Sequence, residues 1–235
     1  MANDDPISEV GTLENIHGGR EVFYNFLSRS YQSEVDSDYL QMLISLSPYF
    51  RQIAKETEVD KLKLGSKSLD EFVTHLRGLT LEMQETLLLD LARDFAYLFL
   101  TGPKSVPMCE SIYLSPDHLL MQEPYTQVLL DYETIGFRAS DDLKEPEDHL
   151  ATQFKFMAVL SQRIRLTIAA GDADNAARLV NFQKTYLENH LAKWVPSFCY
   201  LLNKAAEGRV FYQTIGYLTE GFLDMDYKFI NDDLL

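Results

Sequence analysis

The sequence predicts an all-α fold, a single helical domain of about ten helices, from three observations. Leucine occurs 35 times, against 21 times for valine and isoleucine together. Helices favour leucine because β-branched side chains lose rotamer freedom against the preceding turn. The 11 glycines and 8 prolines make up about 8% of the chain, where roughly 12% is average, so turns are few. Apolar residues recur at helical spacing, and no alternating strand pattern persists.

The N-terminal part begins with a polar segment. Residues 1–18 show little periodicity, so they predict a flexible leader before a helical domain that spans 19–235. The first helix is predicted by an apolar stripe at 3.6-residue spacing. Its members are Val22, Phe23, Phe26, Leu27 and Tyr31. A second, short helix should end near Pro48.

Capping patterns predict the next two helices. Ser68 and Glu71 have the spacing of a capping box, in which each side chain hydrogen bonds an otherwise unpaired backbone N–H of the first turn. A fourth helix should begin after Thr80 and end at Gly102. Residues 102–114 carry two prolines and no helical period, so they predict an ordered loop.

Proline and glycine mark the middle of the chain. Ser115 is predicted to cap a helix with Pro116 at its first position, where the missing N–H costs no hydrogen bond. A restart at Pro124 would carry this helix to Gly136, and Pro146 would open the following one. Later helices are predicted to begin at Asp172 or Asp174, at Pro196 and at Arg209.

A polar, acidic segment divides the predicted domain. Residues 138–145 are expected to form a hinge between an N-terminal portion, 19–137, and a C-terminal portion, 146–235. Few packing constraints act on so polar a stretch, so we expect it to permit motion of the two portions. The chain is predicted to be a monomer, with a dimer that exchanges halves as the alternative.

Composition excludes several classes of function. The net charge of −15 leaves no evident basic surface for nucleic acid. The longest run without Asp, Glu, Lys or Arg is residues 39–50, whereas a membrane-spanning helix needs about 20 apolar residues. The N-terminus is acidic, unlike a signal peptide, and two cysteines are too few for a disulfide framework. The sequence therefore predicts a cytoplasmic protein without membrane insertion.

No residue set predicts a metal or a catalytic centre. Glu145 and His149 could share a metal only with a remote ligand, and the alternative is capping at a helix start. Residues 102–105 lack the glycine spacing of a phosphate-binding loop. Ser111, His149 and Asp148 are the only suggestive nucleophile set, but adjacent helical residues project about 100° apart. A small hydrolase or GTPase that uses the Asp148/His149 region stays open as an alternative, as does an all-α adaptor.

Residues 145–149 form the least ordinary feature of the sequence. They place three carboxylates and a histidine at one predicted helix start. Repulsion among these charges is unfavourable unless they are solvated or matched by a cation. The cluster therefore predicts either a solvated helix start or a site for a cationic partner.

The chain resembles the TorD/DmsD family of redox-enzyme maturation chaperones through several ordered motifs. Glu-Pro-Glu-Asp-His at 145–149, followed by Phe-Lys-Phe-Met-Ala-Val-Leu at 154–160, is similar to the family signature. Further motifs are Tyr-Leu-Phe-Leu-x-Gly-Pro at 97–103, Pro107, Glu-Ser-Ile-Tyr at 110–113, Tyr132 with Gly136-Phe137, and His-Leu-x-x-Trp-x-Pro-x-Phe at 190–198. The resemblance covers residues 20 to 225. Two positions depart from the pattern, Cys109 where the family often has an aromatic residue and Gln153 where Glu is usual.

The resemblance implies a cytoplasmic chaperone without a catalytic centre or cofactor. Its partners would be the twin-arginine signal peptide and the apo catalytic subunit of a molybdopterin oxidoreductase of the dimethyl sulfoxide or trimethylamine N-oxide reductase type. The chaperone would assist cofactor insertion before export. The peptide-binding residues carried over by motif are Leu98, Phe99, Pro107, Glu110, Ser111, Tyr113, Pro146, Glu147, Asp148 and His149.

The residues themselves agree with a cationic, partly apolar peptide as partner. Glu147 and Asp148 would supply carboxylates for the two arginines, beside the apolar loop that contains Pro107 and Ile112. Because Leu98 and its neighbours precede the polar hinge and 146–149 follow it, we expect the groove to lie between the two portions.

Overall fold

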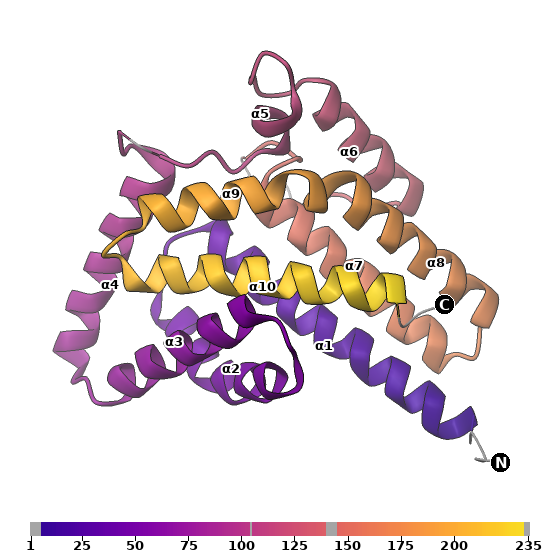
Figure 1. Ribbon diagram of the computed structural model, residues 1–235, viewed down its shortest axis with the longest axis horizontal. Coiled ribbons are helices and arrows are strands. Elements are labelled where there is room, and N and C mark those ends of the chain that lie inside the picture. Colours follow the sequence, from indigo (N-terminus) through magenta and orange to yellow (C-terminus); the bar gives the residue numbers. More distant parts are fainter. Residues whose placement is uncertain (1–5, 104, 140–144, 233–235) are drawn as a thin grey trace. The chain divides into compact units, whose positions relative to one another are not determined.

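The computed structural model describes residues 6–103, 105–139 and 145–232, and side chains from residue 13 to 231 within these ranges. The all-α prediction is confirmed: the described residues form ten α-helices, two π-helical segments and no strand (Figure 1). The helices are α1 (Pro6–Gln32), α2 (Ser37–Glu56), α3 (Asp60–Arg77), α4 (Leu81–Phe95), η1 (Ala96–Leu100), α5 (Glu110–Leu114), α6 (Glu123–Ile135), α7 (Leu150–Ala169), α8 (Ala173–Tyr186), η2 (Leu187–Leu191), α9 (Ala192–Ala205) and α10 (Val210–Asp232). None of these helices is both long and apolar enough to span a bilayer.

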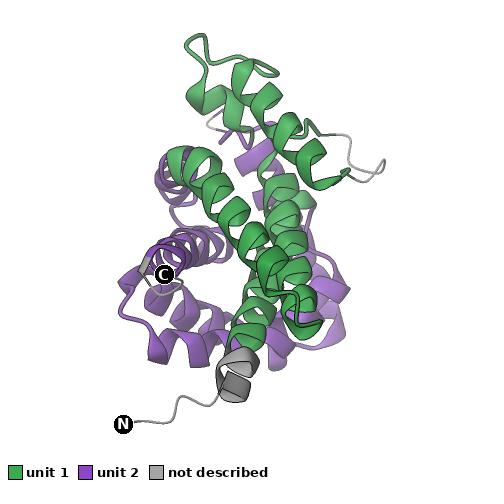
Figure 2. Cartoon of the chain, turned by 90° about the vertical axis from the view of Figure 1, so that its right-hand side faces the viewer, with its two compact units in different colours: residues 1–32, 109–193 green, residues 33–108, 194–235 purple. Residues whose placement is uncertain are grey.

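The chain forms two compact units, and each combines two separated segments of the sequence. Unit 1 contains residues 1–32 and 109–193, and unit 2 contains residues 33–108 and 194–235 (Figure 2). The structure thus differs from the expected division into 19–137 and 146–235, because long-range helix packing groups the segments without regard to the polar hinge. Residues 140–144 of that hinge lie outside the described residues.

In unit 1, α1 and α7 lie side by side in antiparallel orientation (Figure 1). Late in α1, Ser28 donates a hydrogen bond to the Ala151 carbonyl at 2.8 Å, and earlier in α1, Glu21 pairs with Arg165 at 3.1 Å. The expected flexible leader, 1–18, is corrected by this packing, because α1 already begins at Pro6. His17 in that segment is fully buried. Tertiary packing therefore stabilises the start of α1, although the polar residues there show no apolar period that would predict a helix.

The core of unit 1 is aromatic. The ring of Phe156 on α7 lies 4.6 Å from that of Tyr132 on α6 and 4.7 Å from that of Tyr186 on α8. Gln183 adds a buried polar link between α8 and α7, since its amide donates to the Met157 carbonyl at 3.0 Å. These contacts hold α6, α7 and α8 around one centre and fix the segments between them.

In unit 2, α3 and α10 approach closely at two glycines, Gly65 on α3 and Gly221 on α10. A Cβ on Gly221 would lie 2.3 Å from the Leu62 backbone nitrogen, so no larger residue fits there. Ser68 lies in the middle of α3, where its hydroxyl lies 2.6 Å from that of Thr214 on α10. The capping-box prediction is therefore wrong, because Ser68 bonds a neighbouring helix and not its own first turn.

Local sequence signals predict some of the helix ends correctly and others wrongly. Gly136 ends α6 in the left-handed conformation, with φ of 65°, and Asp172 caps α8, both as predicted. Ser115 follows α5 as its C-cap, so the predicted helix start there is wrong. Pro146 also does not open a helix, because α7 begins at Leu150. Pro196 lies inside α9 near its start.

Candidate functional site

The acidic loop, which we define as residues 145–149, is fixed to the start of α5. Asp148 is fully buried, and its Oδ2 accepts the Ser111 backbone N–H at 2.8 Å. The Asp148 carbonyl accepts the Glu110 N–H at 3.1 Å, next to an antiparallel bridge between Cys109 and His149. Burial raises the pKa of Asp148, although hydrogen bonds from Ser111 oppose the shift. Asp148 therefore supplies an acceptor to the otherwise unpaired first turn of α5.

His149 performs the same task for α7. Its Nδ1 accepts the Ala151 backbone N–H at 3.2 Å, and its side chain is buried. Burial lowers the pKa of His149 to about 4, so the imidazole is neutral near pH 7 and can accept through Nδ1. The Asp-His pair of the sequence motif thus joins the acidic loop to two helix starts.

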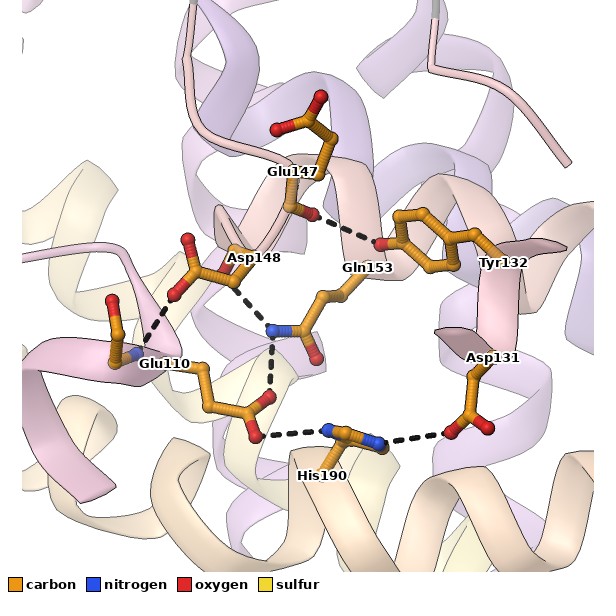
Figure 3. Close-up of polar contacts among 8 residues, drawn as sticks. Glu110, Asp131, Tyr132, Glu147, Asp148, Gln153 and His190 are labelled. Carbon is orange, nitrogen blue, oxygen red and sulfur yellow. Dashed lines mark hydrogen bonds and ion pairs between the residues drawn. The ribbon is translucent and has the colours of Figure 1, made fainter. Parts of the chain in front are cut away.

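A charged cluster lies next to this loop, and we call Glu110, Asp131, Gln153 and His190 the His190 cluster (Figure 3). All of its members except Asp131 are buried. His190 Nδ1 lies 2.9 Å from Glu110 Oε1, and its Nε2 lies 3.0 Å from Asp131 Oδ2. The Gln153 amide donates to Glu110 Oε2 at 2.9 Å and to the Asp148 carbonyl at 3.0 Å. The cluster therefore connects α5, α6, α7, η2 and the acidic loop.

His190 is the cation of this cluster. Burial by itself would lower its pKa, but hydrogen bonds to Asp131 and Glu110 outweigh burial and raise the pKa to about 9. Burial raises the pKa of Glu110 against the opposing hydrogen bonds from His190 and Gln153. We assign a charged imidazolium, because a carboxylate oxygen lies within hydrogen-bond distance of each ring nitrogen, that of Glu110 at Nδ1 and that of Asp131 at Nε2.

The carboxylates that remain accessible are those of Glu145 and Glu147. Glu145 is exposed and Glu147 is half-buried. The Tyr125 hydroxyl donates to Glu147 Oε2 at 2.6 Å. The Tyr132 hydroxyl donates to the Glu147 carbonyl at 3.1 Å (Figure 3). Both the side chain and the backbone of Glu147 are therefore held in place at the surface.

The other predicted site residues of unit 1 divide by burial. Glu110 and Ser111 are buried, whereas Tyr113 and Pro146 are half-buried. The nucleophile set fails on geometry, since Ser111 meets Asp148 through its backbone N–H and His149 Nδ1 faces the Ala151 N–H. Within the ranges that the structure describes, no three His, Cys, Asp or Glu side chains converge as metal ligands. The buried side chains of Asp148 and His149 therefore hold the backbone of the acidic loop against the starts of α5 and α7.

Three predicted residues belong to unit 2. Leu98 and Phe99 lie in the π-helical segment η1, where Leu98 is fully buried and its carbonyl accepts the Val106 N–H at 2.7 Å. The Phe99 ring packs 5.1 Å from that of Phe95, whereas Pro107 is exposed. The inter-portion groove stays a prediction.

Sequence reasoning missed Asp131 and the bonding of His190. His190 lies 59 positions from Asp131 and 80 positions from Glu110 in the sequence, although its ring bonds both. A charged residue with no partner at helical spacing leaves no local signal of such contacts. Gln153 does carry a signal, since Glu is usual at this position in the family that the sequence resembles.

Comparison with known proteins gives consistent results. The family model for the nitrate reductase delta subunit matches residues 62–200. The protein "Chaperone protein TorD" of Photobacterium profundum is 30% identical over 152 residues, which cover 64% of this chain and 68% of the relative. A protein of the same name from Shewanella pealeana is 25% identical, and the match covers 100% of both chains. Another, from Shewanella sp. strain MR-4, is 27% identical, and the match covers 90% of this chain and 94% of the relative.

Proposed function

Because the chain belongs to the nitrate reductase delta subunit family and, within it, to the TorD/DmsD redox-enzyme maturation chaperones, we propose that it binds the twin-arginine signal peptide and the apo catalytic subunit of a molybdopterin oxidoreductase. It is a chaperone and not an enzyme. It acts in the cytoplasm, before export, on a client of the dimethyl sulfoxide or trimethylamine N-oxide reductase type. The observation that carries the proposal is the acidic loop, whose accessible carboxylates suit the arginines of such a peptide.

The acidic loop divides its work between buried and exposed residues. Asp148 and His149 are buried and hold the backbone, so they set the shape of the loop without touching the peptide. Glu145 and Glu147 face solvent in whole or in part and can each accept the planar fork of an arginine side chain. Glu147 is the stronger partner, because its bond from Tyr125 fixes its rotamer before the peptide arrives.

The experiment is calorimetry with a synthetic leader peptide that contains the two arginines. Replacing both arginines with lysine in a second peptide keeps the charge but removes the fork geometry, so we expect clearly weaker binding. Glu147→Gln should weaken binding of the arginine peptide about tenfold, the lower end for a hydrogen bond to a charged group. Glu133→Gln, an exposed change on α6, is the matched control and should leave binding unchanged.

Two results would contradict the proposal. Equal affinity for the arginine and lysine peptides would show that only net charge is recognised. Equal losses from Glu147→Gln and Glu133→Gln would show that the acidic loop has no special part in binding.

A further inference from the structure

Unit 1 contains a cavity of about 590 Å³ between α1, α7 and the segment that follows α6. Four cationic side chains line it: Arg29 from α1, Arg138 after α6, and Lys155 and Arg163 from α7. Among the described residues that line it, none is a carboxylate. In a chain with 36 acidic and 21 basic residues, a pocket of this composition runs against the overall charge.

Two of the four cations of the cavity, Lys155 and Arg163, are positioned by neutral partners. Lys155 Nζ donates to Asn25 Oδ1 at 2.7 Å, and Arg163 donates to the Ile135 carbonyl at the end of α6. Within the described part of the chain, Arg138, Lys155 and Arg163 form no ion pair with a carboxylate. Among the residues that the structure describes, no carboxylate therefore neutralises these three positive charges, and hydrogen bonds orient two of them.

The wall after α6 begins with a segment that is packed against the core of unit 1. Gly136 turns the chain with a φ of 65°, and the Phe137 N–H donates to the Tyr132 carbonyl at 2.8 Å. The Phe137 ring then packs 4.8 Å from that of Tyr132 and 5.1 Å from that of Phe156. Aromatic packing therefore fixes the part of the wall that Phe137 forms, and Phe137 and Val159 add apolar surface to the cavity.

We propose that this cavity binds a small organic phosphate that carries two or more negative charges. Like charges that line one concavity repel each other, and a bound anion removes that repulsion. Guanidinium forks and an ammonium group match phosphate oxygens. The volume lies within the range of small-molecule sites, about 300 to 1,000 Å³.

The arrangement of the cations favours phosphate over carboxylate. They approach from three sides, from α1, from α7 and from the segment after α6. A tetrahedral phosphate offers acceptor oxygens in several directions, whereas a planar carboxylate offers two oxygens in one plane. The apolar side chains of Phe137 and Val159 would contact the organic part of the ligand.

This proposal goes beyond the proposed chaperone function and does not depend on it. A signal peptide with two arginines is cationic and is repelled by the cavity, so the acidic loop and the cavity select ligands of opposite charge. Peptide binding can fail while phosphate binding holds, and the reverse is equally distinguishable.

The test is calorimetry on the full chain with inorganic pyrophosphate as the probe. We expect saturable one-to-one binding. Phenyl phosphate should bind more tightly than inorganic phosphate, because its ring can contact Phe137 and Val159. Citrate should bind at least about tenfold more weakly than pyrophosphate.

Matched variants place the site. Lys155→Gln and Arg163→Gln should each weaken pyrophosphate binding about tenfold or more, as expected for the loss of a hydrogen bond to a charged group. The controls are Lys184→Gln and Arg178→Gln on α8, which remove the same charges outside the cavity. Lys155 is exposed, so its variant should fold even if Arg163→Gln, which loses its bond to α6, does not.

Each contrary result overturns a defined part of the proposal. Absence of saturable pyrophosphate binding, or equal losses in cavity and control variants, would eliminate the site. Citrate binding as tight as pyrophosphate binding would eliminate the phosphate assignment. Equal affinities for phenyl phosphate and inorganic phosphate would eliminate an organic ligand that uses the apolar wall.

Discussion

Replacing His190 with glutamine should destabilise the protein by an amount that depends on pH. The imidazolium bridges Glu110 and Asp131 at 2.9 and 3.0 Å. Its pKa is about 9 in the folded protein and about 6.5 in an unfolded chain. A raised folded-state pKa means that the folded protein binds the proton more tightly, so protonation stabilises the fold.

The magnitude follows from this difference in pKa. At about 1.36 kcal/mol per unit, protonation of His190 contributes at most about 3.4 kcal/mol, and this full amount is present below the unfolded pKa. At pH 7 the contribution is about 2.5 kcal/mol, and it falls below about 0.5 kcal/mol at pH 9. The partial exposure of Asp131 makes these values upper limits, because solvent screens that half of the bridge.

Urea unfolding of the wild type and of His190→Gln at pH 6, 7, 8 and 9 measures the effect. The stability gap between the two proteins should narrow by about 2 kcal/mol from pH 7 to pH 9, because the wild type alone loses the proton. A constant part of the gap will persist, since Glu110 stays buried with Gln153 as its donor. His75→Gln, an exposed change on α3, should show no such dependence.

A gap that stays constant from pH 6 to pH 9 would refute the reasoning. It would mean that the pKa of His190 is the same in the folded and unfolded protein, so that the two carboxylates only offset the effect of burial. A gap that widens with pH would carry the opposite sign and refute the assignment of the cation outright.

Two further predictions concern the acidic loop and its surroundings. Asp148→Ala should lower the free energy of unfolding by about 1 to 3 kcal/mol, because it leaves the buried Ser111 N–H unpaired, whereas Asp148→Asn keeps an acceptor and should cost less. Thermal unfolding of both variants measures the effect. An unchanged unfolding midpoint together with a tenfold loss of peptide affinity would show instead that Asp148 contacts the peptide directly. Hydrogen exchange with the leader peptide should show new protection at residues 146–157, and the separate prediction that Leu98, Phe99 and Pro107 contact the peptide requires protection at 98–107 as well.

The fold was predictable where its signals are local. Leucine stripes, the Gly136 stop and the Asp172 cap each act within one helix, and the structure retains all three. Ser68 misled because a hydroxyl at capping spacing can equally bond a neighbouring helix, here at Thr214. The start of α1 was missed because polar residues carry no apolar period, yet His17 is buried by tertiary packing.

The candidate site was predictable to the extent that it is contiguous. Residues 145–149 stand together in sequence, so their charge was visible, but their division into buried and exposed members was not. Burial of Asp148 depends on α5, 37 residues earlier in the chain. Long-range pairs such as that of His190 with Glu110 need the packed structure, because no spacing rule connects them.

The two ligand sites proposed for unit 1 should act almost independently, although α7 carries residues of both. The acidic loop ends at His149, whereas Lys155 and Arg163 line the cavity. At about 1.5 Å per residue, 6 to 14 helical residues separate them by roughly 9 to 21 Å, which exceeds the screening length of about 8 Å at physiological salt. Saturating pyrophosphate should therefore change the affinity for the leader peptide by less than about twofold. A larger change that persists at high salt would require a movement of α7 between two positions, because direct electrostatic coupling at that distance and ionic strength is too weak to produce it.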